Sequence, residues 1–283
     1  MSSIPLTLAE AVPLGTVLLQ RLLDDAGIRS LAIKGPAFVE LGVRRPRQSN
    51  DIDLLVAPGD RNAATELLTA AGWSIISHWF PPALDDVIYS TTFRHAQFPS
   101  TLDLHHHFSG FFADDAFDAL WRSRTCVAVA HHDVVTVGRE HALVIEGLNA
   151  IKLLDHGSRA EAADRVVGVV ADVDVDAVAE AAESVGARHT AAPLITALGG
   201  GSPSGPPPPG YEQWVQRGAR NSGRDLVLDI LRRAPGQAPR VVWEQLTLDP
   251  YVARFWAQTH GVPYRSPQQI LWVRVRRALA LRR

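Results

Sequence analysis

Residues 47–56 read Arg-Gln-Ser-Asn-Asp-Ile-Asp-Leu-Leu-Val, a polar segment that runs into a short apolar one. Successive side chains of a β-strand point to opposite faces. Asp51 and Asp53 would therefore share one face of a strand, and Ile52 and Leu54 would point the other way, into a core. The stretch predicts a buried strand with two carboxylates side by side at its beginning.

Paired carboxylates are a candidate metal site. Two carboxylates this close repel each other unless a cation lies between them. Carboxylate oxygens, with water and substrate phosphates, are the ligands that Mg²⁺ prefers. We therefore expect Asp51 and Asp53 to hold a divalent cation, Mg²⁺ or Mn²⁺. The alternative is that both lie in a solvated turn before the strand, because Asp-x-Asp is a pattern that often arises by chance.

The segment upstream is a candidate phosphate site. Residues 31–36 read Leu-Ala-Ile-Lys-Gly-Pro, an apolar strand that enters a glycine turn. Glycine lets backbone N–H groups approach an anion closely, and a following helix adds its positive N-terminal end. Lys34 would add a compact charge, and only two of the 28 basic residues of the chain are lysines. A Lys-Gly turn followed by Asp-x-Asp on the next strand is a stronger signal than either pattern alone.

A third carboxylate follows in residues 101–105, Thr-Leu-Asp-Leu-His. Alternation places Asp103 and His105 on one face of this strand. Two metal ions about 4 Å apart can stabilise both the attacking and the leaving oxygen of a phosphoryl displacement. Holding both ions plausibly takes three carboxylates, so we expect Asp103 to lie beside Asp51 and Asp53 and to help deprotonate an acceptor hydroxyl.

In this order, the three segments resemble the nucleotidyltransferase superfamily of the DNA polymerase beta type. They are most similar to a bacterial branch typified by Leu-Lys-Gly, an arginine, Asp-Ile-Asp-Leu-Leu-Val and Asp-Leu-His. The resemblance covers about residues 31–105, and the region that follows fits more loosely. It implies an enzyme that moves a nucleoside monophosphate from a nucleoside triphosphate, ATP in the first instance, to a hydroxyl or phosphate of an acceptor.

The resemblance also implies roles for particular residues. The metal ligands and catalytic groups would be Asp51, Asp53 and Asp103. The residues that contact the nucleotide would be Lys34, Gly35, Arg47 and, on the helix after the sheet, Lys152. A lysine on a helix is commonly just solvated, which is the alternative for Lys152.

Two departures from the superfamily pattern keep other functions open. Pro36 follows the glycine, and proline lacks an N–H that could bind phosphate. The stretch from Gly35 to Asp51 is also longer than is usual in the superfamily. The alternatives are a non-catalytic nucleotide-binding or regulatory module of the same fold, and a toxin-like enzyme that modifies tRNA or protein. The acceptor stays open as a small molecule, a protein or RNA.

The hydrophobic pattern indicates an α/β (α+β) fold, a mixed sheet flanked by helices and followed by a mostly helical region. We expect an α/β nucleotidyltransferase domain over residues 1–138, a helical region packed on it over 139–198, a Gly/Pro linker or loop over 199–210, and a C-terminal helical region over 211–283. Expected strands lie near residues 30–33, 52–56, 73–79, 87–93, 102–106, 126–130 and 134–137. Expected helices include 8–26, 58–71, 115–121, 139–156, 160–170, 175–184 and 267–283, the last as an arginine-rich surface helix.

The composition narrows the setting. The formal net charge of −2 gives no sign of a general nucleic-acid binder. No apolar run approaches the ~20 residues of a membrane span, so we expect no membrane partner. A single cysteine, Cys126, excludes an internal disulfide, and with the unremarkable N-terminus it favours a cytoplasmic location.

Several other residue types are more simply structural. Cys126 lies in an apolar strand and is expected in the core. The run His105 to His107 cannot all face one metal, because the middle side chain of a strand points away, and no further zinc ligands accompany it. His131 and His132 are expected in a turn, and the seven tryptophans mostly in the core or in docking contacts.

Overall fold

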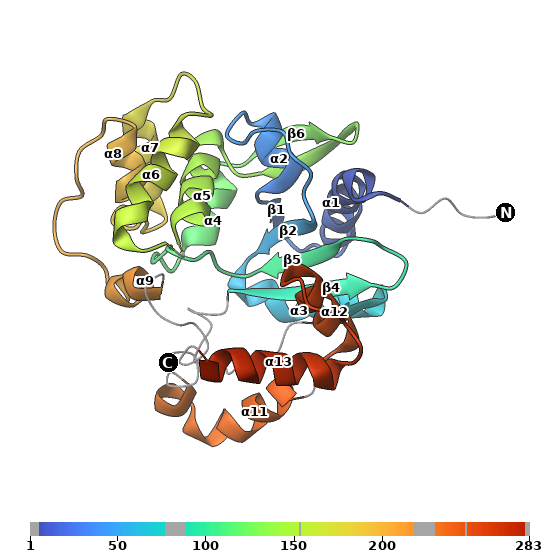
Figure 1. Ribbon diagram of the computed structural model, residues 1–283. Helices are drawn as coiled ribbons and strands as arrows, with labels where there is room; N and C mark the ends of the chain where they lie inside the picture. The colour runs from blue at the N-terminus through green and yellow to red at the C-terminus, as the bar shows by residue number, and fades with distance from the viewer. Residues whose placement is uncertain (1–5, 77–88, 153, 218–229, 247, 281–283) are drawn as a thin grey trace.

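The computed structural model of the chain describes residues 6–76, 89–152, 154–217, 230–246 and 248–280. Its centre is a seven-stranded mixed sheet with the strand order β3-β4-β5-β2-β1-β7-β6 (Figure 1). The strands are β1 (Ser30–Ala32), β2 (Asp51–Val56), β3 (Trp73–Ile75), β4 (Ser90–His95), β5 (Thr101–His105), β6 (Thr125–Val129) and β7 (His132–Thr136). The expected mixed α/β fold is confirmed.

Strand β2 lies in the middle of the sheet. It pairs with β1 in antiparallel and with β5 in parallel orientation. All of its residues after Asp51 are buried, as is typical of a strand covered on both faces. The pairing of β2 with β5 sets Asp53 opposite Asp103 and Asp51 opposite Thr101.

Among the described residues, five helical elements flank the sheet in the first half of the chain: α1 (Leu8–Asp25), α2 (Gly35–Glu40), η1 (Pro58–Asp60), α3 (Arg61–Ala70) and α4 (Ala116–Arg122). Thr7 and Glu10 form a capping box that begins α1. The buried Gln20 of α1 then donates to the backbone oxygens of Ser30 and Val135, and so ties the helix to β1 and β7. These contacts fix the strand that delivers Lys34.

Four helices follow the sheet and pack on one another: α5 (Arg139–Ile151), α6 (His156–Val167), α7 (Val175–Ser184) and α8 (Ala192–Ala197) (Figure 1). The helical pattern expected over residues 139–156 is wrong in its continuity, because α5 ends at Ile151. Asp155 is the N-cap of the next helix, and its carboxylate accepts a hydrogen bond from the Ser158 backbone N–H. The break leaves Lys152 at the C-terminal end of α5.

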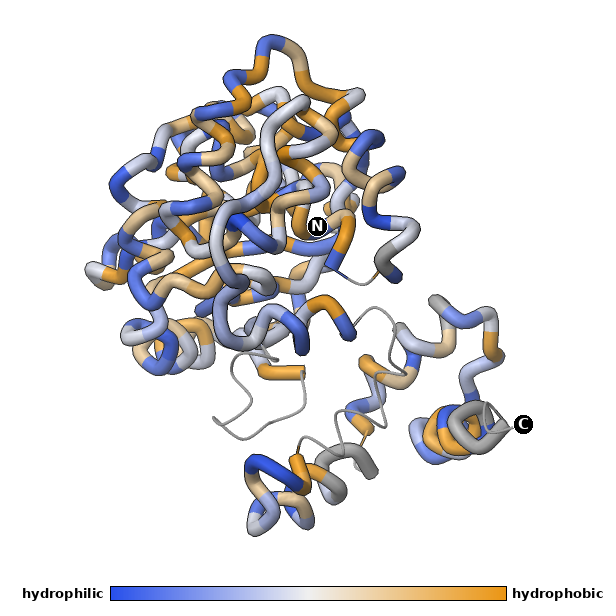
Figure 2. Tube along the Cα trace, turned by 90° about the vertical axis from the view of Figure 1, so that its left-hand side faces the viewer, coloured by the Kyte–Doolittle hydropathy of each residue, from blue (hydrophilic) through white to orange (hydrophobic). Residues whose placement is uncertain are grey.

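Residues 199–210 contain no helix or strand, as the Gly/Pro composition indicates. Beyond them lie α9 (Tyr211–Arg217), η3 (Pro235–Gln237), α11 (Ala238–Leu246), α12 (Pro250–Thr259) and α13 (Pro267–Ala280). Helices α12 and α13 share a small core of their own, formed by Leu248, Ala253, Ala257 and Ile270. Figures 1 and 2 show α11 and α13 standing apart from the body that contains the sheet.

The expectation that Cys126 lies in the core is wrong, and the described tryptophans are divided between core and surface. Cys126 is exposed rather than buried, because it lies on the face of β6 opposite Val127 and Val129, which pack on the core. Trp243 and Trp272 are 67% and 64% exposed, whereas Trp73 and Trp214 are buried as expected. Trp79 lies outside the described residues.

The turn expected at His131 and His132 is present and directly precedes β7. Ala130 and His131 both have positive φ and connect β6 to β7 as a two-residue hairpin loop. Among the described residues, no helix combines the length and the apolar character that crossing a bilayer would require.

Candidate metal and nucleotide site

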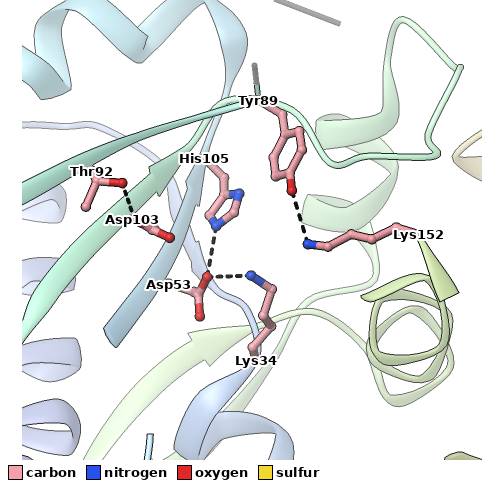
Figure 3. A network of polar contacts seen from close by, with 7 residues as sticks. All are labelled: Lys34, Asp53, Tyr89, Thr92, Asp103, His105 and Lys152. Atoms are coloured by element: carbon pink, nitrogen blue, oxygen red, sulfur yellow. Dashed lines mark hydrogen bonds and ion pairs between the residues drawn. The ribbon is translucent and has the colours of Figure 1, made fainter. Parts of the chain in front are cut away.

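Strands β2 and β5 bring two of the predicted carboxylates together. Asp53 and Asp103 are register partners on these parallel neighbours, so their side chains leave the same face of the sheet (Figure 3). Each of Asp53, Asp103 and His105 offers a possible ligand atom, and these atoms lie within 4.8 Å of one another. Possible metal ligands from two segments about 50 residues apart along the chain thus form one cluster.

One oxygen of the Asp53 carboxylate accepts hydrogen bonds from two side chains. Lys34 Nζ lies 2.5 Å and His105 Nε2 lies 2.9 Å from Oδ1 (Figure 3). Burial alone would raise the pKa of Asp53, but the hydrogen bond from His105 and the Lys34 charge outweigh it and lower that pKa. Asp53 is therefore held as a carboxylate, with its second oxygen outside these two contacts.

His105 enters this contact as a neutral ring. Burial lowers its pKa, although the bond to Asp53 opposes that change. With Nε2–H donating to Asp53, Nδ1 is left buried, and no described residue forms a hydrogen bond with it. Phe108 and Tyr89 lie beside the ring, and Tyr89 is stacked on it at 5.8 Å between centroids.

Asp103 and Asp51 complete the group of carboxylates. Thr92 on β4 donates to Oδ1 of Asp103 at 2.6 Å, and the second oxygen of Asp103 is turned toward Asp53 (Figure 3). Burial, followed by the charges of Asp53 and Asp103, raises the pKa of Asp51 to about 6. Asp51 is thus close enough to feel the other two charges, although it does not belong to the 4.8 Å group.

The glycine turn has the backbone geometry that the sequence suggested. Lys34 has φ 67° and ψ −156°, and Gly35 has φ +52°, a region that favours glycine. Pro36 lies in the first turn of α2, where proline is well tolerated. The ammonium of Lys34 lies on Asp53, and the contact of Lys34 with a nucleotide phosphate stays a prediction.

Lys152 faces the same cluster from the end of α5. Its Nζ donates to the Tyr89 hydroxyl at 3.1 Å, and the Tyr89 ring is stacked on His105 (Figure 3). Sequence reasoning missed Tyr89 and Thr92. Both become visible only once β4 is paired with β5, because their neighbours across the sheet, not their own sequence context, place them at the site.

The sequence of the chain matches a family model described as "uncharacterised nucleotidyltransferase" over residues 14–191, which is well over half of the chain. The match includes every predicted site residue. The chain belongs to this nucleotidyltransferase family.

Solved structures match the nucleotidyltransferase at low identity. The lincosamide antibiotic adenylyltransferase LnuA, bound to lincomycin, is 13% identical with a TM-score of 0.36, covering 56% of this chain and 96% of its own. ANT(2″)-Ia in complex with adenylyl-2″-tobramycin is 17% identical with a TM-score of 0.36, covering 66% and 98%. An antigenic nucleotidyltransferase-like protein from Paracoccidioides brasiliensis is 14% identical with a TM-score of 0.36, covering 69% and 94%. No curated protein matches significantly.

Arg47 of the nucleotidyltransferase, predicted to contact the nucleotide, lies on the segment before β2. It lines a cavity of about 190 Å³ together with Arg44, Arg45, Arg165 and Glu146, and with apolar side chains of α5 and α6. Burial raises the pKa of Glu146 against the opposing charges of Arg47 and Lys34. Glu146 therefore stands between the cavity and the carboxylate cluster, and sequence reasoning gave no sign of it.

The donor set of the nucleotidyltransferase fits a divalent cation. Three carboxylates, Asp51, Asp53 and Asp103, act on one another electrostatically, and Lys34 is the cation that the structure sets among them. Burial is the largest cause of the raised pKa of Asp51, and the charges of Asp53 and Asp103 raise it further against the opposing charge of Lys34. Carboxylate oxygens are the ligands that Mg²⁺ and Mn²⁺ prefer, and a cluster with more negative than positive charge favours binding of a cation.

Proposed function

We propose that the nucleotidyltransferase moves a nucleoside monophosphate from a nucleoside triphosphate, with ATP as the donor, to a hydroxyl or phosphate of an acceptor. Asp51, Asp53 and Asp103 would hold two magnesium ions, and Lys34, Gly35 and Lys152 would contact the nucleotide. The register pairing of Asp53 with Asp103 carries this proposal, because it unites on one face the carboxylates that the reaction needs. Family membership alone supports nucleotide transfer only in general terms.

The reaction balances as a single displacement. An acceptor oxygen forms a bond to the α-phosphorus, the bond from that phosphorus to the bridging oxygen of the β-phosphate breaks, and pyrophosphate leaves with the electron pair. The acceptor proton passes to the Asp103 carboxylate and from there to solvent. When bound, the divalent cations supply charge stabilisation for the attacking and leaving oxygens.

The residues of the chain supply position and charge around that displacement. Asp53 is fixed in orientation by Lys34 and His105, and Asp103 by Thr92. Fixed orientation matters because a pre-organised site need not reorganise as the charge develops. The Lys34 ammonium, which contacts Asp53, would supply a positive charge to the phosphates of the bound nucleotide.

The test compares three asparagine variants, Asp51→Asn, Asp53→Asn and Asp103→Asn, with Asp133→Asn, an exposed residue of β7, as the matched control. Pyrophosphate release is measured with each of the four common nucleoside triphosphates, Mg²⁺ or Mn²⁺, and cell extract as the source of acceptor. Losing several kcal/mol of charge stabilisation lowers transfer at least about 100-fold. We expect this loss in all three site variants and none in the control.

Binding is measured in parallel so that a missing acceptor cannot imitate inactivity. Calorimetry with Mg²⁺ and a non-hydrolysable ATP analogue should show binding that Asp53→Asn removes. Binding without any turnover in extract would identify a non-catalytic nucleotide-binding module instead. Retention of metal-dependent transfer by both Asp51→Asn and Asp53→Asn would exclude this site.

A further inference from the structure

A second feature of the fold lies beside the carboxylate cluster and has no role in the chemistry above. The cavity of about 190 Å³ is lined by the segment 43–47 before β2 and by helices α5 and α6. Arg47 is four residues from Asp51, so their Cα atoms are at most about 14 Å apart. Glu146, which lines the cavity, also interacts electrostatically with Lys34 and Asp53, so the cavity lies near the candidate metal site.

The lining of the cavity divides into two kinds of surface. Four arginines and one glutamate give it a formal charge of +3, from Arg44, Arg45, Arg47, Arg165 and Glu146. The other lining side chains are all small and apolar: Val43, Ala150, Ala162, Val166 and Val169. A triphosphate alone would leave this apolar half without a complementary surface, whereas a molecule with an anionic end and a short hydrocarbon part would fill both halves.

The arginines at the rim are engaged only weakly. Arg45 donates to the Gly168 carbonyl at 3.5 Å, the limit of a hydrogen bond. Arg165 pairs with Glu161 at 2.9 Å, but both side chains are more than 60% exposed, and exposed ion pairs of this kind contribute little. A bound carboxylate or phosphate can replace these contacts, and guanidinium groups match such anions with paired hydrogen bonds.

Glu146 supplies a polar atom on the inner wall. Its Oε1 lies 3.4 Å from Nε of Arg44, and both side chains are largely buried. Its other oxygen, Oε2, is buried and has no hydrogen-bond partner among the described residues. A buried polar atom without a partner costs free energy, and a ligand hydroxyl in the cavity would satisfy it.

We propose that this cavity is the acceptor subsite, and that the acceptor is a small molecule with a carboxylate or phosphate joined to a short apolar segment. The proposal rests on the proposed function, since it names the substrate class of the same site. The rim arginines would bind the anion, the alanines and valines would contact the hydrocarbon, and Glu146 would orient the hydroxyl.

Four probes that share a five-carbon chain and differ in the head group test the proposal: pentanoate, pentyl phosphate, pentylamine and pentanol. Binding to the full chain is followed by saturation-transfer NMR, with and without Mg²⁺ and a non-hydrolysable ATP analogue. We expect the two anions to bind and the amine and alcohol not to bind. We also expect the nucleotide to leave anion binding in place, because acceptor and donor occupy different subsites.

Two double variants, one inside the cavity and one outside it, test whether the anions bind in the cavity. Arg45→Met with Arg165→Met should weaken binding of both anions at least about ten-fold, since two charged hydrogen-bonding groups are lost. It should change affinity for the nucleotide analogue less than about two-fold. Arg122→Met with Arg124→Met, at exposed arginines outside the cavity, should change neither.

The outcomes separate this proposal from the proposed function. If the nucleotide displaces the anionic probes, or the Arg45/Arg165 variant loses the nucleotide as Asp53→Asn does, the cavity is part of the triphosphate site and the acceptor proposal is overturned. It is equally overturned if all four probes bind alike. If the chain binds the anions but no nucleotide under any condition, it is the proposed function that fails.

Discussion

The ammonium of Lys34 lies 2.5 Å from Oδ1 of Asp53, with both side chains almost fully buried. This lysine stabilises the negative charge of Asp53, whose neighbours Asp51 and Asp103 are also acidic. Burial would lower the pKa of Lys34, but the Asp53 charge and hydrogen bond raise it. The ammonium is the internal counter-ion of a cluster that divalent cations would otherwise neutralise.

Replacing this counter-ion should make folding depend on metal. Removing one partner of a buried ion pair costs about 3–5 kcal/mol, so Lys34→Met should unfold at a clearly lower temperature than the unsubstituted chain in EDTA. Because a divalent cation can take over the lost charge, Mg²⁺ should raise the melting temperature of Lys34→Met more than that of the unsubstituted chain. Calorimetric melts in EDTA and Mg²⁺ measure both; equal metal-dependent shifts in the two proteins would contradict this account of Lys34.

His105 should act as a positioning residue for Asp53. Its buried Nε2 contacts Oδ1, and loss of such an outer contact typically costs 10–100-fold in metal affinity or activity. His105→Phe should therefore weaken Mn²⁺ binding, measured by electron paramagnetic resonance, by about that factor. His105→Asn, which keeps a donor of shorter reach, should recover part of it. A merely structural role would lower the melting temperature and leave Mn²⁺ affinity unchanged.

Lys152 should affect nucleotide binding more than the rate of the bound complex. Its Nζ lies at the Tyr89 hydroxyl, beside the cluster rather than within it. Lys152→Met should raise KM for the nucleoside triphosphate about ten-fold, the effect of one charged hydrogen bond, with kcat changed much less. Tyr89→Phe, which keeps the ring beside His105, is the control and should leave KM within about two-fold. Steady-state kinetics distinguish this from the opposite pattern, a fall in kcat at constant KM.

His141 should make the stability of the helical region depend on pH. It lies on α5, is 7% exposed, and contacts the hydroxyls of Ser123 and Ser184. Burial lowers its pKa to about 4, so the folded state favours the neutral ring. The stabilisation is complete above the unfolded pKa of about 6.5 and is lost as the pH falls toward 4.

The lowered pKa of His141 sets the size of the loss of unfolding free energy at low pH. At pH 5 the loss relative to pH 8 amounts to at most about 2 kcal/mol. His141→Gln cannot titrate, so urea melts at pH 8 and pH 5 should show a smaller loss of unfolding free energy in the variant. Equal losses in both proteins would show that His141 is not buried as a neutral ring.

Much of the fold follows from local patterns. The alternation over residues 51–56 and 101–105 predicts two strands with their carboxylates on one face, and both strands are present. The expected helix over 175–184 is present with its N-cap, Asp174. Such features are readable because periodicity and capping depend only on residues within one or two turns of each other.

Other expectations failed where partners distant in sequence decide the outcome. Cys126 has apolar neighbours that suggest a core position, yet it lies on the exposed face of β6. The pattern over residues 139–156 is helical throughout, yet the Asp155 cap begins a new helix. The sequence of a single strand does not show which of its faces the rest of the chain will cover.

The amino-acid sequence by itself determined which acidic residues share a face, where the glycine turn lies, and the family to which the chain belongs. Only the tertiary structure decided that Asp53 meets Asp103 in register, that Lys34 lies on Asp53, and that four arginines surround one cavity. The physical reason is the range of the interactions. Strand periodicity is a property of adjacent residues, whereas pairing, burial and ion contacts arise only when segments far apart in the chain are packed together.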